Sequence, residues 1–259
     1  MTLPTDEHYG IRIPPVKPRL VLTTSWDDGH PLDLRVADLL AKYDLKGTFY
    51  IPCENQGDIL PARQIGELAK TFEVGAHTVH HVPLTSVADA LAREEILGSK
   101  RNIEEITGKP CRIFCFPMGQ FEKRHLSMLR DAGFTAARTV ELLSLDSPRN
   151  TNGVALIPTT VQAYSHPTAA YWKNCLKRFK LKNLQYIQRF GTVRAWEATA
   201  ISILESARKR GGVFHLWGHS SEIQECGEWE GLERVFSMMR ESRRDALCVT
   251  NSELCDYVN

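Results

Sequence analysis

The sequence predicts an α/β fold, a closed or nearly closed (β/α) barrel of parallel strands in a single domain. Short apolar runs alternate with longer amphipathic segments along the chain, and no repeat or low-complexity linker interrupts them. The length of 259 residues suits one barrel domain. An open doubly wound sheet is the second choice, and in both architectures the functional groups gather at the carboxyl ends of the strands.

The first half of the chain begins with a polar, proline-rich segment, residues 1–18, which we expect to form an irregular arm before a catalytic domain at 19–259. Ser86 is expected to cap a long helix, because serine is a preferred helix N-cap, and Gly108 to end it. Pro61 suits the first position of a shorter helix. The pattern predicts strands at 19–26, 46–53 and 73–77, and helices at 31–45, 61–72 and 87–107.

The second half continues the alternation up to a short terminal helix. Its basic stretch 173–189 is expected to be a solvated helix face. The pattern predicts strands at 111–117, 135–140, 153–164, 212–219 and 246–250, and helices at 123–134, 168–190, 194–211, 228–242 and 252–258.

The composition excludes several classes of protein. Thirty-two basic and 31 acidic residues give a net charge of +1, so the composition does not indicate a nucleic-acid-binding protein. No apolar run approaches the roughly 20 residues of a membrane span, and the start of the chain lacks the features of a secretory signal, so we expect a cytoplasmic protein. The seven scattered cysteines contain no CxxC pair and are expected to be small core residues in a reducing compartment.

Titratable side chains stand at the carboxyl ends of three predicted strands. Asp27 and Asp28 follow the first, His77 ends the third with His81 four residues later, and His219 ends a late one. Adjacent carboxylates before a glycine are also ordinary in a solvated turn. However, two imidazoles four residues apart share one face of a helical turn, and with a carboxylate they form a ligand set typical of catalytic zinc and related ions.

The motifs SWDDGH, HTVHH, FPMG and HLWGH, in this order, resemble those of the polysaccharide deacetylases, the fourth carbohydrate esterase family, over residues 20–220. The resemblance implies an α/β fold that is a distorted (β/α) barrel of about seven parallel strands. It also implies a metal-dependent hydrolase that removes an N-acetyl group from an amino sugar. The substrate would be an oligo- or polysaccharide, or a nucleotide- or lipid-linked sugar precursor. The metal would be Zn²⁺, with Co²⁺, Ni²⁺ or Mn²⁺ as alternatives, because an Asp/His/His set accepts several divalent ions.

The resemblance also implies a role for each motif residue. Asp28, His77 and His81 would hold the metal, with His80 as the alternative in the double histidine. Asp27 would be the general base, Thr78 would steady the histidine loop, the backbone N–H of Met118 would stabilise the oxyanion, and His219 would be the general acid.

The chain departs from the family pattern at Cys115, where the family has the arginine that pairs with the base. Arg138, at another strand end, is expected to orient Asp27 instead, and it is grouped with Trp26 and Trp217 among the residues expected near the substrate. Either tryptophan could equally belong to the core. His219 is preferred to His215 as the acid, because it lies at the end of its strand.

Other polar residues receive weaker expectations. His8, His30, His125 and His166 are expected at the surface or in turns, and Glu222 is a candidate substrate contact. Two other functions stay open: an allantoinase-like amidohydrolase on the same fold, and a catalytically weak carbohydrate-binding relative. The oligomeric state is left open.

Overall fold

The computed structural model describes residues 20–54, 57–177, 183 and 195–258. The predicted N-terminal arm lies outside the described residues. So does the continuation of the predicted helix 168–190 beyond Lys177, except for Asn183.

In the described part of the chain, ten strands form one sheet whose neighbours are parallel, except for one antiparallel pair. The strands are β1 (Leu20–Asp27), β2 (Thr48–Ile51), β3 (Glu73–Ala76), β4 (Ile113–Cys115), β5 (Ala136–Arg138), β6 (Arg149–Thr151), β7 (Val154–Ile157), β8 (Val161–Gln162), β9 (Gly212–Gly218) and β10 (Ala246–Cys248). Their order is β6-β7-β5-β4-β3-β2-β1-β9-β8, with β10 also paired to β1. This single, mostly parallel sheet confirms the predicted fold class.

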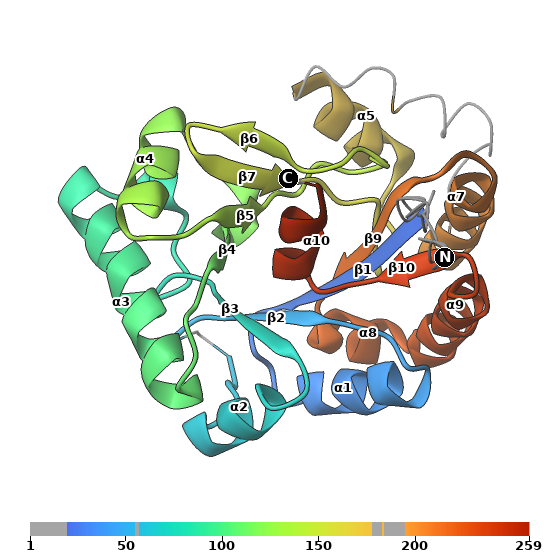
Figure 1. The fold of residues 1–259 in the computed structure, drawn as a ribbon, viewed down its shortest axis with the longest axis horizontal. Helices are drawn as coiled ribbons and strands as arrows, with labels where there is room; N and C mark the ends of the chain where they lie inside the picture. The colour runs from blue at the N-terminus through green and yellow to red at the C-terminus, as the bar shows by residue number, and fades with distance from the viewer. Residues whose placement is uncertain (1–19, 55–56, 178–182, 184–194, 259) are drawn as a thin grey trace, which may run out of the picture.

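Most of the helices lie around the outside of the sheet (Figure 1). They are α1 (Asp33–Lys42), α2 (Ala62–Leu68), α3 (Asp89–Thr107), α4 (Lys123–Asp131), α5 (Thr168–Lys177), α7 (Trp196–Arg210), α8 (Ser220–Cys226), α9 (Trp229–Ser242) and α10 (Asn251–Val258), with short 3-10 turns η1 (Leu84–Ser86) and η2 (Pro117–Gly119). Among the described residues, no helix is both long enough and apolar enough to cross a membrane.

Among the residues that the structure describes, strand pairing does not close the sheet, so the barrel is distorted. The sheet ends at β6 on one side and β8 on the other, and irregular backbone bridges the gap. Leu143 N donates to Thr160 O at 2.8 Å, and Thr160 N donates to His215 O at 2.9 Å. The loop after β5 is thereby joined to the backbone before β8 and to β9.

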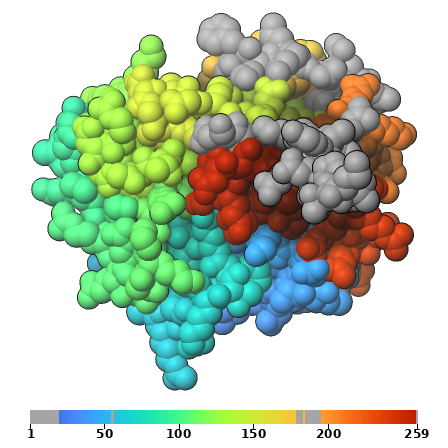
Figure 2. Space-filling view, in the orientation of Figure 1, coloured from blue at the N-terminus to red at the C-terminus, as the bar shows by residue number. Residues whose placement is uncertain are grey.

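Helix α10 closes the amino-terminal end of the barrel. It lies in the middle of the ring of strands, and its atoms occupy the centre of the same face in the space-filling view (Figures 1 and 2). Leu254 and Cys255 belong to a buried cluster with Val21, Ile113 and Val213, which stand near the starts of their strands. The open end of the barrel is therefore the carboxyl end of the strands.

Alternation along β1 decides which of its side chains face the barrel interior. All eight residues of β1 are buried, because one face packs against helices and the other faces the interior. Trp26 joins the cluster beneath the helices and meets Phe236 of α9 edge-on, with ring centroids 6.0 Å apart. Asp27, the next residue, therefore faces the interior.

Several predicted boundaries are wrong. Residues 153–164 do not form one strand: after β7 pairs with β5, the chain leaves the sheet at Pro158, and β8 then pairs with β9. Ser86 does not cap α3, which begins at Asp89, because its hydroxyl donates to Pro83 O at 2.7 Å within η1. Pro61 is the residue before α2 and not its first. The predicted stop at Gly108 is confirmed, with φ of 65°.

Candidate metal-dependent active site

The turn after β1 directs two adjacent carboxylates to different places. Asp27 ends the strand, and Asp28 has φ of 78°, a left-handed conformation that aspartate tolerates better than most residues. Gly29 follows with φ of 65°, and a Cβ there would lie 2.7 Å from Ile51 Cγ2, so the position requires glycine. Asp28 N donates to Tyr50 O at 3.0 Å, which ties the turn to β2.

The loop after β3 brings His77 and His81 together, although it does not form the predicted helical turn. Thr78 and His81 have φ of 65° and 51°, so the chain folds back on itself instead. The two imidazole centroids are 4.9 Å apart. The spacing therefore predicted the pair correctly, whereas the helical reason for it was wrong.

Glu95 of α3 holds this loop from behind, a role that the sequence did not suggest. Its buried carboxylate accepts hydrogen bonds from the backbone N–H groups of Val79, at 2.8 Å, and His80, at 2.9 Å. The His80 ring lies 2.6 Å from the other carboxylate oxygen. His80 is thus engaged with α3, and His81 is the histidine that faces Asp28.

Asp28, His77 and His81 form a compact set of possible metal ligands. Oδ1 of Asp28 lies 3.5 Å from Nε2 of His77 and 3.1 Å from Nε2 of His81. In the described part of the chain, this oxygen is buried without a hydrogen-bond partner. One carboxylate oxygen and two imidazole nitrogens suit a divalent cation, so the residues present fit the expected metal.

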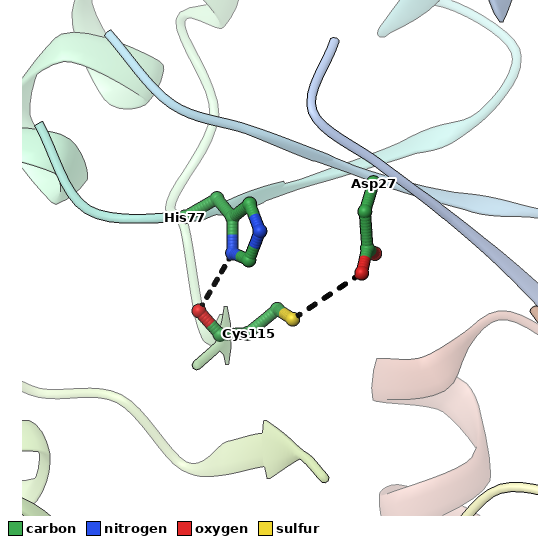
Figure 3. Close-up of side chains that lie close together, drawn as sticks. All are labelled: Asp27, His77 and Cys115. Carbon is green, nitrogen blue, oxygen red and sulfur yellow. Dashed lines mark hydrogen bonds between the residues drawn. The ribbon is translucent and has the colours of Figure 1, made fainter. Parts of the chain in front are cut away.

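The backbone of Cys115 orients His77 for this role. Nδ1 of His77 donates to the carbonyl oxygen of Cys115 at 2.8 Å, as Figure 3 shows. Because a carbonyl can only accept, Nδ1 carries the proton and Nε2 is free to face Asp28. A backbone carbonyl behind a histidine is a common support for metal-binding imidazoles.

A second group, Asp27, His77 and Cys115, also places three potential ligand atoms within 4.8 Å of one another (Figure 3). Burial raises the pKa of the Cys115 thiol well above its ordinary value, so the thiol keeps its proton. Asp27 is already paired with Arg138. The Asp28–His77–His81 set is therefore the better candidate for the metal.

Arg138 supplies the positive charge that Cys115 cannot. The two residues are register partners on the neighbouring strands β4 and β5, and the buried Arg138 guanidinium forms an ion pair with Asp27. Burial raises the pKa of Asp27, but the charge and hydrogen bond of Arg138, together with the charges of His77 and His219, outweigh burial and keep this pKa below its ordinary value. Arg138 lies behind Asp27 and does not line the cavity, so grouping it with substrate contacts was wrong.

His219 completes the site from β9. Its Nε2 lies 4.0 Å from Asp27 Oδ2 and 3.9 Å from Asp28 Oδ2, and its Nδ1 donates to Glu222 Oε2 at 2.7 Å. Burial lowers the pKa of His219, but the Glu222 hydrogen bond and the Asp27 charge together raise it to about 9. Glu222 is thus the partner of His219, which its position three residues later on α8 could have indicated.

His215 differs from His219 in every respect that matters for proton transfer. It is fully buried, its Nε2 lies 2.9 Å from Ser25 Oγ, and its Nδ1 donates to Pro158 O at 3.0 Å. Burial, aided by the Arg138 charge, lowers its pKa to about 3. His215 is therefore a neutral core histidine.

Asp27, His77, His81 and His219 line a cavity of about 350 Å³. Trp217 lines it, but Trp26 faces α9 from the other side of the sheet, so placing Trp26 near the substrate was wrong. The cavity is lined by Asp27, His77, His81, Phe116, Met118, Gly119, Val140, Leu142, Gln162, His166, Ala170, Asn174, Trp217 and His219.

Two histidines differ from their expected surface positions. His166 lines the cavity, where its Nε2 lies 2.7 Å from Gln162 Oε1. His125 is fully buried, and its Nδ1 accepts a hydrogen bond from Glu122 N at the start of α4.

The fold and site define a distorted (β/α) barrel with a carboxylate and histidine site at the carboxyl ends of its strands. The resemblance to the polysaccharide deacetylases is confirmed: residues 14–137 match the family model described as polysaccharide deacetylase. A comparison with curated proteins finds no match.

Solved structures share the fold at low sequence identity. A candidate polysaccharide deacetylase from Mycobacterium smegmatis is 15% identical, with a TM-score of 0.68 over 94% of this chain and 91% of that one. The Bc1960 peptidoglycan N-acetylglucosamine deacetylase is 15% identical, with a TM-score of 0.56 over 93% and 89%. BA3943 of Bacillus anthracis, a pseudoenzyme, is 17% identical, with a TM-score of 0.53 over 92% and 66%. Because active and inactive proteins share this fold, activity must be argued from the site.

Proposed function

We propose that this protein is a metal-dependent hydrolase that removes an N-acyl group, with acetyl as the first group to test, from an amino sugar. One observation carries the proposal. The ionised Asp27, the two histidines of the Asp28–His77–His81 set and the His219 imidazole, whose pKa is raised to about 9, line one cavity, and Asp28 contacts both histidines. An amide hydrolase needs these three elements: a base, a metal site and an acid.

Asp28, His77 and His81 would hold the metal. When bound, a divalent cation supplies Lewis-acid polarisation of the substrate carbonyl and lowers the pKa of a nearby water. The metal charge would also relieve the repulsion between the adjacent carboxylates of Asp27 and Asp28.

Asp27 and His219 would move the protons. Arg138 keeps Asp27 ionised and fixes its orientation, so its carboxylate can accept a proton from the attacking water. His219 holds a proton at neutral pH because of Glu222 and Asp27, so its Nε2 can donate to the departing amine. The base and the acid are thus set apart by their neighbours: arginine beside one and carboxylates beside the other.

The backbone N–H of Met118 is the proposed oxyanion donor. Met118 lies in η2 with φ of 55°, and Gly119 follows with φ of 62°. A Cβ at Gly119 would collide with Val140, so glycine lets the turn lie close against the cavity wall. Donors fixed by such a turn need no reorganisation during the reaction.

The test is metal analysis of the purified protein together with an assay of acetate release from N-acetylhexosamines. Asp28→Ala should remove the metal. Asp27→Asn should keep the metal but lower turnover by about 10²–10⁴-fold, the usual contribution of a general base. The exposed Asp58→Asn is the matched control. Wild-type protein without bound metal, or Asp28→Ala with unchanged metal content, would contradict the proposal.

A further inference from the structure

The cavity next to the proposed metal site has an apolar wall on one side. Phe116 and Met118 follow β4, and Val140 and Leu142 follow β5. Apart from the weakly accepting sulfur of Met118, their side chains offer no hydrogen bond to a ligand. They suit an aliphatic or aromatic group, whose burial is favourable in proportion to its apolar area.

The polar side chains in the cavity are held by the protein itself. Asn174 accepts from Leu142 N at 3.1 Å and donates to Val140 O at 2.7 Å, so its amide fastens the loop after β5. Gln162 donates to Glu222 at 3.0 Å and lies 2.7 Å from His166 through its oxygen. Both amides therefore serve the framework around the site.

A pyranose ring would be poorly matched to this apolar wall. Each sugar hydroxyl taken from water needs a new hydrogen-bond partner, and burying a hydroxyl without one is costly. An alkyl chain has no such requirement. A methyl group, similar in size to a water molecule whose share of liquid volume is about 30 Å³, would occupy little of the cavity.

The places of the proposed acid and the proposed oxyanion donor indicate which part of the substrate meets the apolar wall. The departing amine must lie near His219 to receive its proton. The acyl carbonyl oxygen must instead lie near the backbone N–H of Met118 in η2, the turn that follows Phe116 and packs against Val140. The acyl group therefore lies against the apolar wall.

We propose that this wall is an acyl-binding site and that the preferred acyl group is an apolar chain longer than acetyl. The inference rests on the proposed function, because the chain must be attached to an amide that this site hydrolyses. It narrows the substrate class to amines that carry an extended aliphatic acyl group.

The test uses the zinc-loaded protein and glucosamine carrying acetyl, butanoyl or hexanoyl groups. We expect kcat/KM to rise along the series, by up to about fourfold for each methylene that becomes buried. Isothermal titration with acetate, butanoate and hexanoate should give the same order of affinity without any turnover.

Variants of the wall test its location. Leu142→Asn and the more conservative Val140→Thr, which adds only a hydroxyl in place of a methyl, should flatten the dependence on chain length. Leu97→Asn changes an exposed leucine of α3 that does not line the cavity, so it should leave the dependence unchanged.

The possible failures are distinguishable. Highest kcat/KM and affinity for the acetyl compounds would overturn the acyl-chain inference and leave the proposed function in place. If both wall variants kept the wild-type dependence on chain length, the acyl group would not lie against this wall. Failure of the metal-loaded protein to hydrolyse any acyl amide would overturn the proposed function and this inference with it.

Discussion

At the scale of single residues, the pairing of Asp27 with Arg138 determines the state of the proposed base. Removing one partner of a buried ion pair leaves an uncompensated charge and costs about 3–5 kcal/mol. Arg138→Met should therefore lower the free energy of unfolding by about that amount and raise the pKa of Asp27. Urea unfolding measures the first effect, and the acid limb of the pH–rate profile measures the second, since it should move to higher pH.

The register of β4 and β5 provides a sharper control. Because Cys115 and Arg138 are register partners on β4 and β5, the Cα of an arginine at 115 would lie at the same height in the barrel as that of Arg138. Its guanidinium could therefore approach Asp27 from the neighbouring strand. The double variant Cys115→Arg/Arg138→Ala should recover part of the turnover lost in Arg138→Ala. No recovery in a folded double variant would show that Asp27 needs its arginine on β5.

Glu222 determines the protonation of the proposed acid. Glu222→Gln removes the carboxylate that raises the pKa of His219, so this pKa should fall from about 9 toward its ordinary value of 6.5. His219 then loses its proton at lower pH, so the alkaline limb of the profile of kcat/KM against pH should move to lower pH. Glu225→Gln, an exposed change on the same helix, should leave the profile in place. An unmoved limb in Glu222→Gln would argue against His219 as the acid.

At the scale of elements, α3 and the loop after β3 work as a unit. The Glu95 carboxylate accepts hydrogen bonds from two backbone N–H groups of this loop. In Glu95→Gln, the side-chain NH₂ group replaces one of the two accepting oxygens, so the loop loses part of its support. We expect metal affinity to fall by about 10–100-fold, the usual cost of losing support behind metal ligands. Competition with a chromogenic chelator measures it, and the exposed neighbour Glu94→Gln is the control. Equal affinities in the two variants would refute this role.

Element prediction succeeded where local signals and tertiary pairing agree. Alternating apolar runs located the strands up to β5, and Gly108 marked the end of α3. It failed between residues 153 and 164, because the apolar run continues while the chain crosses from β5 to β9. Nothing in the local pattern records which strand each half will pair with.

At the scale of the whole molecule, Asp33 links helices α1 and α8 beneath the site. It is fully buried and accepts a 2.6 Å hydrogen bond from Ser220, and burial raises its pKa to about 8. Between about pH 4 and pH 8 the folded state therefore holds a proton that the unfolded state releases. Global stability should fall as pH rises through this window.

Asp33→Asn removes this titration. Relative to the wild type, the variant should gain stability between pH 5 and pH 8, by about 1 kcal/mol per pH unit. Urea unfolding of the chelator-treated proteins at several pH values measures this difference. A difference that does not depend on pH would mean that Asp33 is ionised in the folded protein.

The sequence by itself determined the fold class and placed Asp27–Asp28, His77–His81 and His219 at the ends of strands, because hydrophobic periodicity and strand-end positions are local properties. The roles of these residues in catalysis stay predictions. Trp26 could have been excluded too, since Trp26 and Asp27 must face opposite sides of one strand. The predicted pairing of Arg138 with Asp27 is confirmed. Only the tertiary structure decided that Glu95 holds the histidine loop and that Glu222 pairs with His219. These pairings join distant strands and helices or depend on side-chain geometry, and such contacts are set by the register and curvature of the sheet.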